Sequence, residues 1–303
     1  MKKRVALLVD GNSMAWRAFH AGWRKDKPDL EFEGKPTGMI FRFLRSIKML
    51  LEQHTDIGWC KIAWDGGKPA FRTKLLPTYK QREQRDPQMM ESFIVQEREL
   101  IPLTAQLGVS GFRVIGWEAD DLIGLQARVH GFHQLILYSG DRDMWQLVGN
   151  PNYQRVAVAF PQHADLLTPE TFVKMVGFDS YKQWFWFRVL TGDASDKIPG
   201  VPSIGEKRAR EIIESGWPYT DAPPKWAGTV AANKQTIDRN MKLMDLNFSS
   251  QILEREWRER KAAVSHYVAA QDLNAAKNTF KELGMFGQLE GWSRWADAFR
   301  RLS

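Results

Sequence analysis

The chain has 303 residues, of which 43% are apolar, enough to bury a sizeable core, so we expect a globular protein. Its net charge of +7 favours a polyanionic partner without singling out nucleic acid. The single Cys60 excludes an internal disulfide and a cysteine-rich zinc site and fits a reducing cytoplasm, so any metal would need oxygen ligands. The first apolar run stops at Asp10, and no later window is long and apolar enough to span a membrane.

In the first part of the chain, short apolar runs alternate with helical patterns. Strands are predicted at Val5–Val9, Lys61–Trp64, Phe112–Ile115, Leu135–Tyr138 and Val156–Phe160, and helices at Asn12–Ala21, Gly38–Gln53, Gln88–Leu107, Asp120–His130 and Phe172–Val176. This order indicates an α/β fold. Because the strands are apolar throughout rather than alternating, they should be mostly parallel and buried on both faces of a central sheet.

From about Tyr181 onward the sequence contains no convincing strand and reads as helices joined by loops rich in glycine and proline. We therefore divide the chain into an α/β core, residues 1–180, and a helical region, residues 181–303. Residues 221–303 carry no recognisable motif. Trp292–Arg301 has the pattern of an amphipathic terminal helix that either packs on the body or contacts a ligand.

Acidic residues follow each of the first four predicted strands. They are Asp10 after the first strand, Asp65 after the second, Glu118, Asp120 and Asp121 after the third, and Asp141 and Asp143 after the fourth. A lone aspartate after a strand is usually a turn former or a helix cap. The carboxyl ends of parallel strands share one edge of the sheet, however, so these side chains should converge there. Carboxylates in such close contact either raise one another's pKa values or require a cation, and oxygen ligands favour Mg²⁺ or Mn²⁺ over zinc.

A second acidic group, Asp193 and Asp196, follows the helical stretch Tyr181–Val189. It suggests a second metal ion. Two ions roughly 4 Å apart can promote in-line phosphoryl displacement without a Cys, His or Ser nucleophile. The histidines show no paired metal-ligand spacing, and the Gly-x-Ser-x-Gly motif is absent.

Five segments carry a family resemblance. They are Leu8–Ser13, Ala63–Arg72, Tyr79–Lys80, Glu118–Gly124 and Ser139–Asp143. In this order they resemble the flap endonuclease superfamily, in particular the 5′-nuclease domain of bacterial DNA polymerase I and stand-alone phage 5′ exonucleases. The resemblance implies a PIN-like core with a helical arch over about residues 76–100. It also implies that Asp10 and Asp141 are catalytic, that Lys80 and Arg72 orient the scissile phosphate, and that Tyr79 stacks on an unpaired base.

Gly192–Ala209 resembles the helix-turn-helix by which this family holds duplex DNA, within a helix-hairpin-helix region of about residues 186–215. The alternative is a simple turn between helices. By resemblance, main-chain carbonyls here hold a K⁺ ion that bridges to a DNA phosphate, and the carbonyls expected are those of Leu190, Thr191, Pro199, Val201 and Ile204. The expected DNA contacts are Ser203, Gly205, Lys207 and Arg208 in this region and Tyr79, Lys80, Arg82 and Arg85 in the arch.

Two positions depart from the family pattern. Ser203 stands where the family often has glycine, so the hairpin either approaches DNA less closely or uses the hydroxyl. The arch motif usually reads Tyr-Lys-x-x-Arg, whereas here Arg82 comes one residue early, which leaves the roles of Arg82 and Arg85 open.

The resemblance implies a monomeric, cytoplasmic enzyme of replication or repair, phage-encoded or bacterial. It would hydrolyse DNA at 5′ flaps, nicks or free 5′ ends with two Mg²⁺ or Mn²⁺ ions, and RNA–DNA hybrids are a further substrate to consider. Two other functions remain open: a catalytically silent module that binds DNA structures, and a PIN-like ribonuclease.

Overall fold

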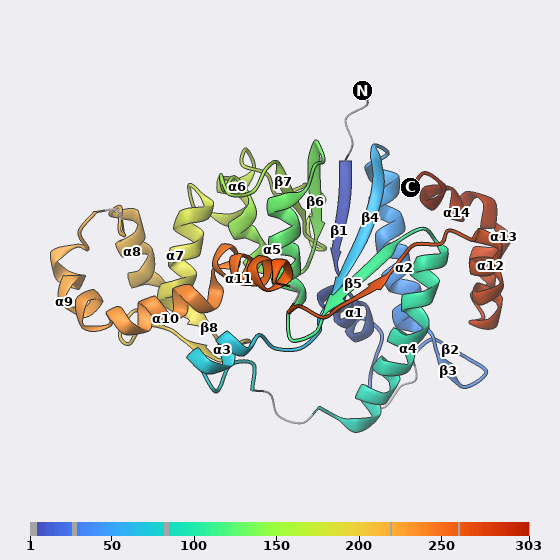
Figure 1. Ribbon diagram of the computed structural model, residues 1–303, viewed down its shortest axis with the longest axis horizontal. Helices are drawn as coiled ribbons and strands as arrows, with labels where there is room; N and C mark the ends of the chain where they lie inside the picture. Colours follow the sequence, from blue (N-terminus) through green and yellow to red (C-terminus); the bar gives the residue numbers. More distant parts are fainter. Residues whose placement is uncertain (1–4, 26–28, 82–84, 219, 260, 303) are drawn as a thin grey trace.

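The computed structural model describes residues 5–25, 29–81, 85–218, 220–259 and 261–302. Its centre is a sheet of six strands in the order β10-β5-β4-β1-β6-β7 (Figure 1). The strands are β1 (Val5–Asp10), β4 (Ile57–Trp64), β5 (Ser110–Val114), β6 (Gln134–Tyr138), β7 (Val156–Ala159) and β10 (Val264–Tyr267). The first five pair in parallel. The predicted α/β class and mostly parallel sheet are confirmed.

The sheet is buried on both faces, as the uninterrupted apolar strands predict. In β1, Ala6 and Leu8 pack in one hydrophobic core, while Val5, Leu7 and Val9 pack in a second. The first core is completed by α5 (Ala119–Val129), α7 (Tyr181–Thr191), α8 (Glu206–Glu214), α10 (Lys234–Met244) and α11 (Leu246–Arg258). The second is completed by α1 (Gly11–His20), α2 (Gly38–Gln53), α4 (Pro87–Gln106), α12 (Leu273–Glu282) and α14 (Trp292–Arg300).

The remaining elements are short. They are β2 (Glu31–Phe32), β3 (Lys35–Pro36), α3 (Ala70–Leu75), the 3₁₀ turn η1 (Arg142–Leu147), α6 (Phe172–Val176), β8 (Gly192–Asp193), β9 (Ile198–Pro199), α9 (Pro224–Ala232) and α13 (Phe286–Glu290). In Figure 1, α7 to α10 lie at one end of the molecule and α12 to α14 at the other. Among the helices in the described ranges, none has the length and apolarity to cross a membrane.

The expectation that no strand follows Tyr181 is wrong. β10 extends the sheet by pairing antiparallel with β5, and β8 and β9 form a small hairpin. The chain therefore returns to the N-terminal sheet after the helices α7 to α11. The terminal helix α14 packs on the body, where Trp292 and Phe299 are buried in the second core.

The order of the strands fixes where a functional crevice forms. From β1 the chain builds outward through β4 and β5 on one side and then through β6 and β7 on the other. The carboxyl ends of β1 and β6 therefore flank the point where the strand order reverses, which is where open α/β sheets bind their ligands. Asp10 ends β1 at this point, and Ser139 to Asp141 follow β6.

Candidate active site

Asp10 lies at the centre of the carboxyl edge and is only 2% exposed. Its Oδ2 accepts a hydrogen bond from the Ser139 hydroxyl at 2.6 Å, and its Oδ1 accepts one from the Ser13 amide at 3.0 Å. Burial raises the pKa of Asp10 to about 6, and the nearby Asp65 raises it further, although these hydrogen bonds oppose the shift. A nearby cation would therefore stabilise the ionised form of Asp10.

Asp141, beside Asp10, is the N-cap of η1, and Asp143 lies in the first turn of η1. The Asp143 amide donates to Asp141 Oδ1 at 2.8 Å, and the Asp141 amide donates to the Ser139 hydroxyl at 3.0 Å. Burial, followed by repulsion from neighbouring carboxylates, raises the pKa of both groups to about 6. Asp120, at the start of α5, has its pKa raised by burial and by Asp141. These side chains form one interacting acidic group.

Asp65 belongs to the same edge, and its side chain is more accessible to solvent than those of Asp10, Asp120, Asp141 and Asp143. Its amide donates to Asn12 Oδ1 at 2.7 Å, and its Oδ1 accepts from the Ala119 amide at 2.8 Å. The ends of β1 and β4 and the start of α5 are thereby tied together. The pKa of Asp65 is raised by burial and by Glu118 and Asp121, and is lowered by the Ala119 amide and by Lys80.

Asp193 and Asp196 form a second group together with Asp143, and one ligand oxygen from each lies within 4.8 Å of the others. The guanidinium of Arg188 bridges this group through its Nη2, which donates to Asp143 at 3.0 Å and also to Asp193. Burial would raise the pKa of Asp193, but the Ser195 hydroxyl and Arg188 lower it overall. The pKa of Asp196 is raised to about 6 by burial and by Asp143 and Asp193, against the opposing effect of Lys80.

Sequence reasoning did not assign a role to Arg188. The available signal was that Arg188 interrupts the apolar run 184–190 within α7, a position where an arginine needs a buried partner. Its Nε is also buried without a hydrogen-bond partner. Arg188 thus holds Asp143 and Asp193 together in this structure.

Lys80 points into the acidic edge. Its ammonium lies 2.8 Å from Glu118 Oε1 and 3.7 Å from Asp196 Oδ2, so it connects the two acidic groups. Its backbone has φ of 47°, and its amide donates to the Asp196 carbonyl at 2.9 Å. Burial lowers the pKa of Lys80, but Glu118 and other neighbours raise it well above its usual value. Lys80 therefore stays charged at the site.

Arg72 and Asp121 do not occupy the predicted positions. Arg72 is 2% exposed and Asp121 is 0% exposed. Arg72 Nη1 and Nη2 donate to the two Asp121 oxygens at 2.7 Å each. Nη1 also donates to Glu118 Oε2 at 2.8 Å, and Nε donates to the Leu243 carbonyl at 2.9 Å. In this structure the guanidinium of Arg72 is taken up by protein acceptors rather than exposed for a phosphate, and it holds both oxygens of Asp121. The pair fixes Glu118 and anchors α3 instead.

Tyr79 differs from the prediction in the same way. Its side chain is 3% exposed, and its hydroxyl donates to Glu118 Oε2 at 2.7 Å. It therefore presents no face on which a base could stack. In the arch, the Arg85 guanidinium lies 3.8 Å from the centre of the Trp16 ring. Arg82 lies outside the described residues.

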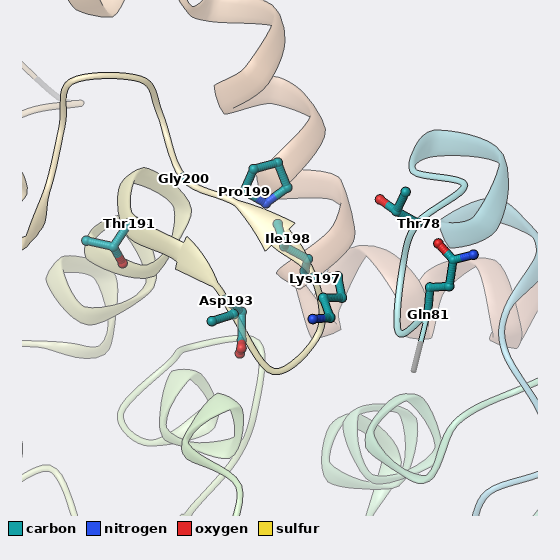
Figure 2. A pocket seen from close by; sticks show the side chains of 9 residues that line it. Thr78, Gln81, Thr191, Asp193, Lys197, Ile198, Pro199 and Gly200 are labelled. Carbon is teal, nitrogen blue, oxygen red and sulfur yellow. The ribbon is translucent and has the colours of Figure 1, made fainter. Parts of the chain in front are cut away.

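The β8–β9 hairpin and the α3–α4 connection border a cavity of about 670 Å³. Figure 2 shows Thr78 and Gln81 on one side and Asp193 and Lys197 on the other. The hairpin depends on glycine, because a Cβ on Gly200 would lie 2.4 Å from the Thr191 carbonyl oxygen. The cavity opens directly beside the second acidic group.

The carbonyls predicted for K⁺ gather around this hairpin, and three of them accept hydrogen bonds from the protein. Leu190 accepts from the Val201 amide at 2.8 Å, Val201 from the Ile204 amide at 3.0 Å, and Pro199 from Asn240 Nδ2 at 2.9 Å. Thr191 lines the cavity. These hydrogen bonds stabilise the hairpin.

The predicted duplex-binding residues lie at the start of α8. Gly205 is its N-cap, and Lys207 and Arg208 occupy its exposed first turn. Ser203 has φ of 65°, a left-handed conformation that favours glycine, and its carbonyl accepts from Arg208 at 2.6 Å. The departure from the family's glycine is therefore accommodated with some backbone strain.

The acidic edge suits divalent metal ions. Asp10, Asp141, Asp143 and Asp196 are carboxylates that burial pushes toward protonation, with pKa values of about 6, and a hard cation would reverse that shift. Oxygen donors dominate, and no histidine or cysteine joins the cluster found among the described residues. The fold and site together thus define an α/β protein with a group of carboxylates at its sheet edge that could hold a metal ion.

Comparison with known proteins identifies the family. The family profile described as "5′-3′ exonuclease, N-terminal resolvase-like domain" matches residues 5–177, and the chain belongs to this family. It is 33% identical over 216 residues to the thermostable DNA polymerase I of Thermus aquaticus, and 30% identical over 216 residues to the DNA polymerase I of Streptococcus pneumoniae R6. Each match covers 70% of this chain but only 24% of the polymerase.

The fold also matches solved structures. The T5 D15 protein crystallised with metal ions superposes with a TM-score of 0.64 at 21% identity, covering 83% of this chain and 99% of D15. Human GEN1 in complex with Holliday junction DNA superposes with a TM-score of 0.51 at 16% identity, covering 93% of this chain and 68% of GEN1. These matches confirm the PIN-like 5′-nuclease fold.

Proposed function

We propose that the protein is a divalent-metal-dependent 5′ nuclease that hydrolyses DNA at or near 5′ ends, as a 5′-3′ exonuclease and a 5′-flap endonuclease. The observation that carries the proposal is the convergence of two acidic groups, joined by Lys80, at the point where the strand order reverses. Family membership and the fold match to the T5 D15 flap endonuclease support it.

Asp10, Asp65, Glu118, Asp120, Asp141 and Asp143 would hold one metal ion, and Asp143, Asp193 and Asp196 a second. When bound, two Mg²⁺ or Mn²⁺ ions would activate water and stabilise charge on the leaving oxygen. Lys80 would bind the scissile phosphate from the α3–α4 side and offset its negative charge. Arg72 and Asp121 act as positioning residues, because they fix the Glu118 carboxylate that Lys80 contacts.

Duplex DNA would bind along α8, where free backbone amides and the side chains of Lys207 and Arg208 face a phosphate. We propose that K⁺ binds at the β8–β9 hairpin through carbonyls including that of Thr191, next to the cavity in Figure 2. The arch over residues 76–100 would admit a single strand with a free 5′ end. We also propose that the protein acts on these substrates as a monomer in the cytoplasm.

Two solved neighbours support a DNA substrate and metal binding. A variant of T5 D15 was crystallised as a pseudo-enzyme-product complex with DNA and metal ions, and T5 5′-exonuclease with zinc ions. The two alternatives are less favoured. A silent binding module would not need Lys80 in contact with both acidic groups, and a PIN-like ribonuclease would not need the hairpin and basic first turn of α8.

The proposal is tested by incubating the protein with end-labelled 5′-flap, nicked and linear duplex DNA, and with an RNA flap of the same sequence, in Mg²⁺ or EDTA. We expect Mg²⁺-dependent cuts near the 5′ junction of the DNA flap, reduced at least 100-fold in Lys80→Ala. Cleavage of the RNA flap alone would favour the ribonuclease, and tight flap binding without cutting in Mg²⁺ or Mn²⁺ would favour the silent module.

A further inference from the structure

A second cavity, of about 330 Å³, lies between the sheet and the helices α5 and α11, and none of the acidic edge residues lines it. Its lining comes from β4, β5, α5, α11 and β10, and comprises Lys61, Phe112, Leu122, Leu125, Gln126, Val129, Glu254, Trp257, Arg258 and His266. None of the residues assigned to catalysis, metal binding or DNA binding lines it. Its volume falls at the small end of the range for ligand pockets.

The interior of this cavity is apolar. Leu122 is 2% and Phe112 6% exposed, while Val129 and Trp257 at the mouth are 59% and 43% exposed. Leu122, Leu125 and Val129 recur at helical spacing, so one face of α5 forms a continuous wall. A cavity mouth that exposes large apolar side chains over an apolar interior is typical of a ligand-binding groove or a protein-interaction site.

Lys61 is the unusual member of the lining. Its ammonium lies 4.3 Å from the centre of the Phe112 ring and 5.9 Å from that of Trp59. Within the described parts of the chain, no carboxylate lies within ion-pair distance of Lys61. Burial lowers the pKa of Lys61, which is the expected response of a half-buried ammonium without a counterion.

The one acidic residue of the lining does not supply the missing charge. Glu254 Oε1 lies 2.5 Å from Arg258 Nη2, and Glu254 Oε2 lies 3.5 Å from Arg128 Nη1. Two arginines therefore neutralise Glu254. Lys61 and His266 both line the cavity, and burial followed by the Coulomb effect of Lys61 lowers the pKa of His266. The cavity offers a positive charge beside an apolar volume.

We propose that this cavity binds an apolar carboxylate, with an aromatic or branched aliphatic group among Leu122, Leu125 and Trp257 and the carboxylate at the Lys61 ammonium. A small organic acid and the C-terminal residue of a peptide share this chemistry. A phosphodiester chain does not fit, because it would have to transfer its charges into an apolar cavity that presents a single ammonium. The inference does not depend on the nuclease proposal.

The test uses the full chain and pairs of ligands that differ only in charge. Isothermal titration at pH 7.5 would compare 4-phenylbutyrate with its neutral amide, and a short peptide ending in phenylalanine with its amidated form. We expect each acid to bind at least tenfold more tightly than its amide. If the peptide binds more tightly than phenylbutyrate, the natural ligand is the C-terminus of a protein. If phenylbutyrate binds more tightly than the peptide, the natural ligand is a small organic acid.

Two variants and one control locate the site. Lys61→Met should remove the preference for the acid, Gln126→Trp should fill the cavity and weaken every probe at least tenfold, and Lys174→Met, on an exposed face of α6, should change nothing. All three should melt near the wild-type temperature and retain nuclease activity. Equal affinity for acid and amide, absence of binding by all four probes, or an unchanged preference in Lys61→Met would overturn the inference.

Discussion

Replacing Asp10 by asparagine should stabilise the metal-free protein at neutral pH. Asp10 is 2% exposed, and its pKa rises from 3.8 to about 6 in the folded state. The folded state therefore binds this proton more tightly than the unfolded state. Relative to a protein in which Asp10 is always ionised, protonated Asp10 therefore contributes to the free energy of unfolding. This contribution is fully present below the unfolded pKa and is lost as pH rises through the folded pKa. A shift of that size corresponds to about 3 kcal/mol at neutral pH.

Asparagine removes this charge while keeping the local hydrogen bonds. Its oxygen can accept from the Ser13 amide, and its amide can donate to the Ser139 hydroxyl. In EDTA at pH 7.5, Asp10→Asn should be more stable than wild type by up to about 3 kcal/mol, and by roughly 2 kcal/mol less at pH 4.5, where wild-type Asp10 is mostly protonated.

Urea denaturation of both proteins at pH 4.5 and 7.5, in EDTA, measures these differences. The matched control is Asp165→Asn, which replaces an exposed aspartate that belongs to neither acidic group and should leave the free energy of unfolding unchanged at both pH values. If Asp10→Asn is less stable at pH 7.5, or if its difference from wild type is the same at both pH values, the proposed burial of an unfavourable charge is wrong.

Three further predictions follow from the site and the hairpin. Mg²⁺ should raise the melting temperature more at pH 7.5 than at pH 5, because protons compete for carboxylates whose pKa values lie near 6; equal increases in scanning calorimetry would count against this metal site. Arg188→Met should lower metal-free stability by a few kcal/mol and tighten Mn²⁺ binding measured by titration, since it leaves Asp143 and Asp193 without a cation; weaker Mn²⁺ binding would refute this reading. Gly200→Ala should lower the melting temperature by several degrees and weaken binding to duplex DNA, whereas Gly228→Ala, whose Cβ meets no atom within 4 Å, should do neither.

The sequence predicted the parallel sheet and the acidic edge because both depend on local patterns. Apolar runs specify buried strands, and an aspartate after a parallel strand must lie at the shared edge. Asp10, Asp65 and Asp141 were located by this rule. Lys80 was selected by resemblance, and the structure places its ammonium against Glu118 and Asp196.

The remaining features depend on contacts between distant segments. Asp120 and Asp121 are adjacent in α5, so their side chains point about 100° apart and only one can face the edge. Asp121 instead pairs with Arg72, which also binds the Leu243 carbonyl far along the chain. β10 is a short strand held by pairing with β5, and no local periodicity marks it. Such partners are visible only once the chain is folded.

The most direct test of the account is the rate at which the protein cuts a 5′-flap DNA in Mg²⁺, measured for wild type and Asp141→Asn, with Asp165→Asn as the control. We predict cleavage near the junction that EDTA abolishes, that Asp141→Asn slows by at least 100-fold and that Asp165→Asn leaves unchanged. Cleavage at the wild-type rate in Asp141→Asn would show that the acidic edge is not the catalytic centre.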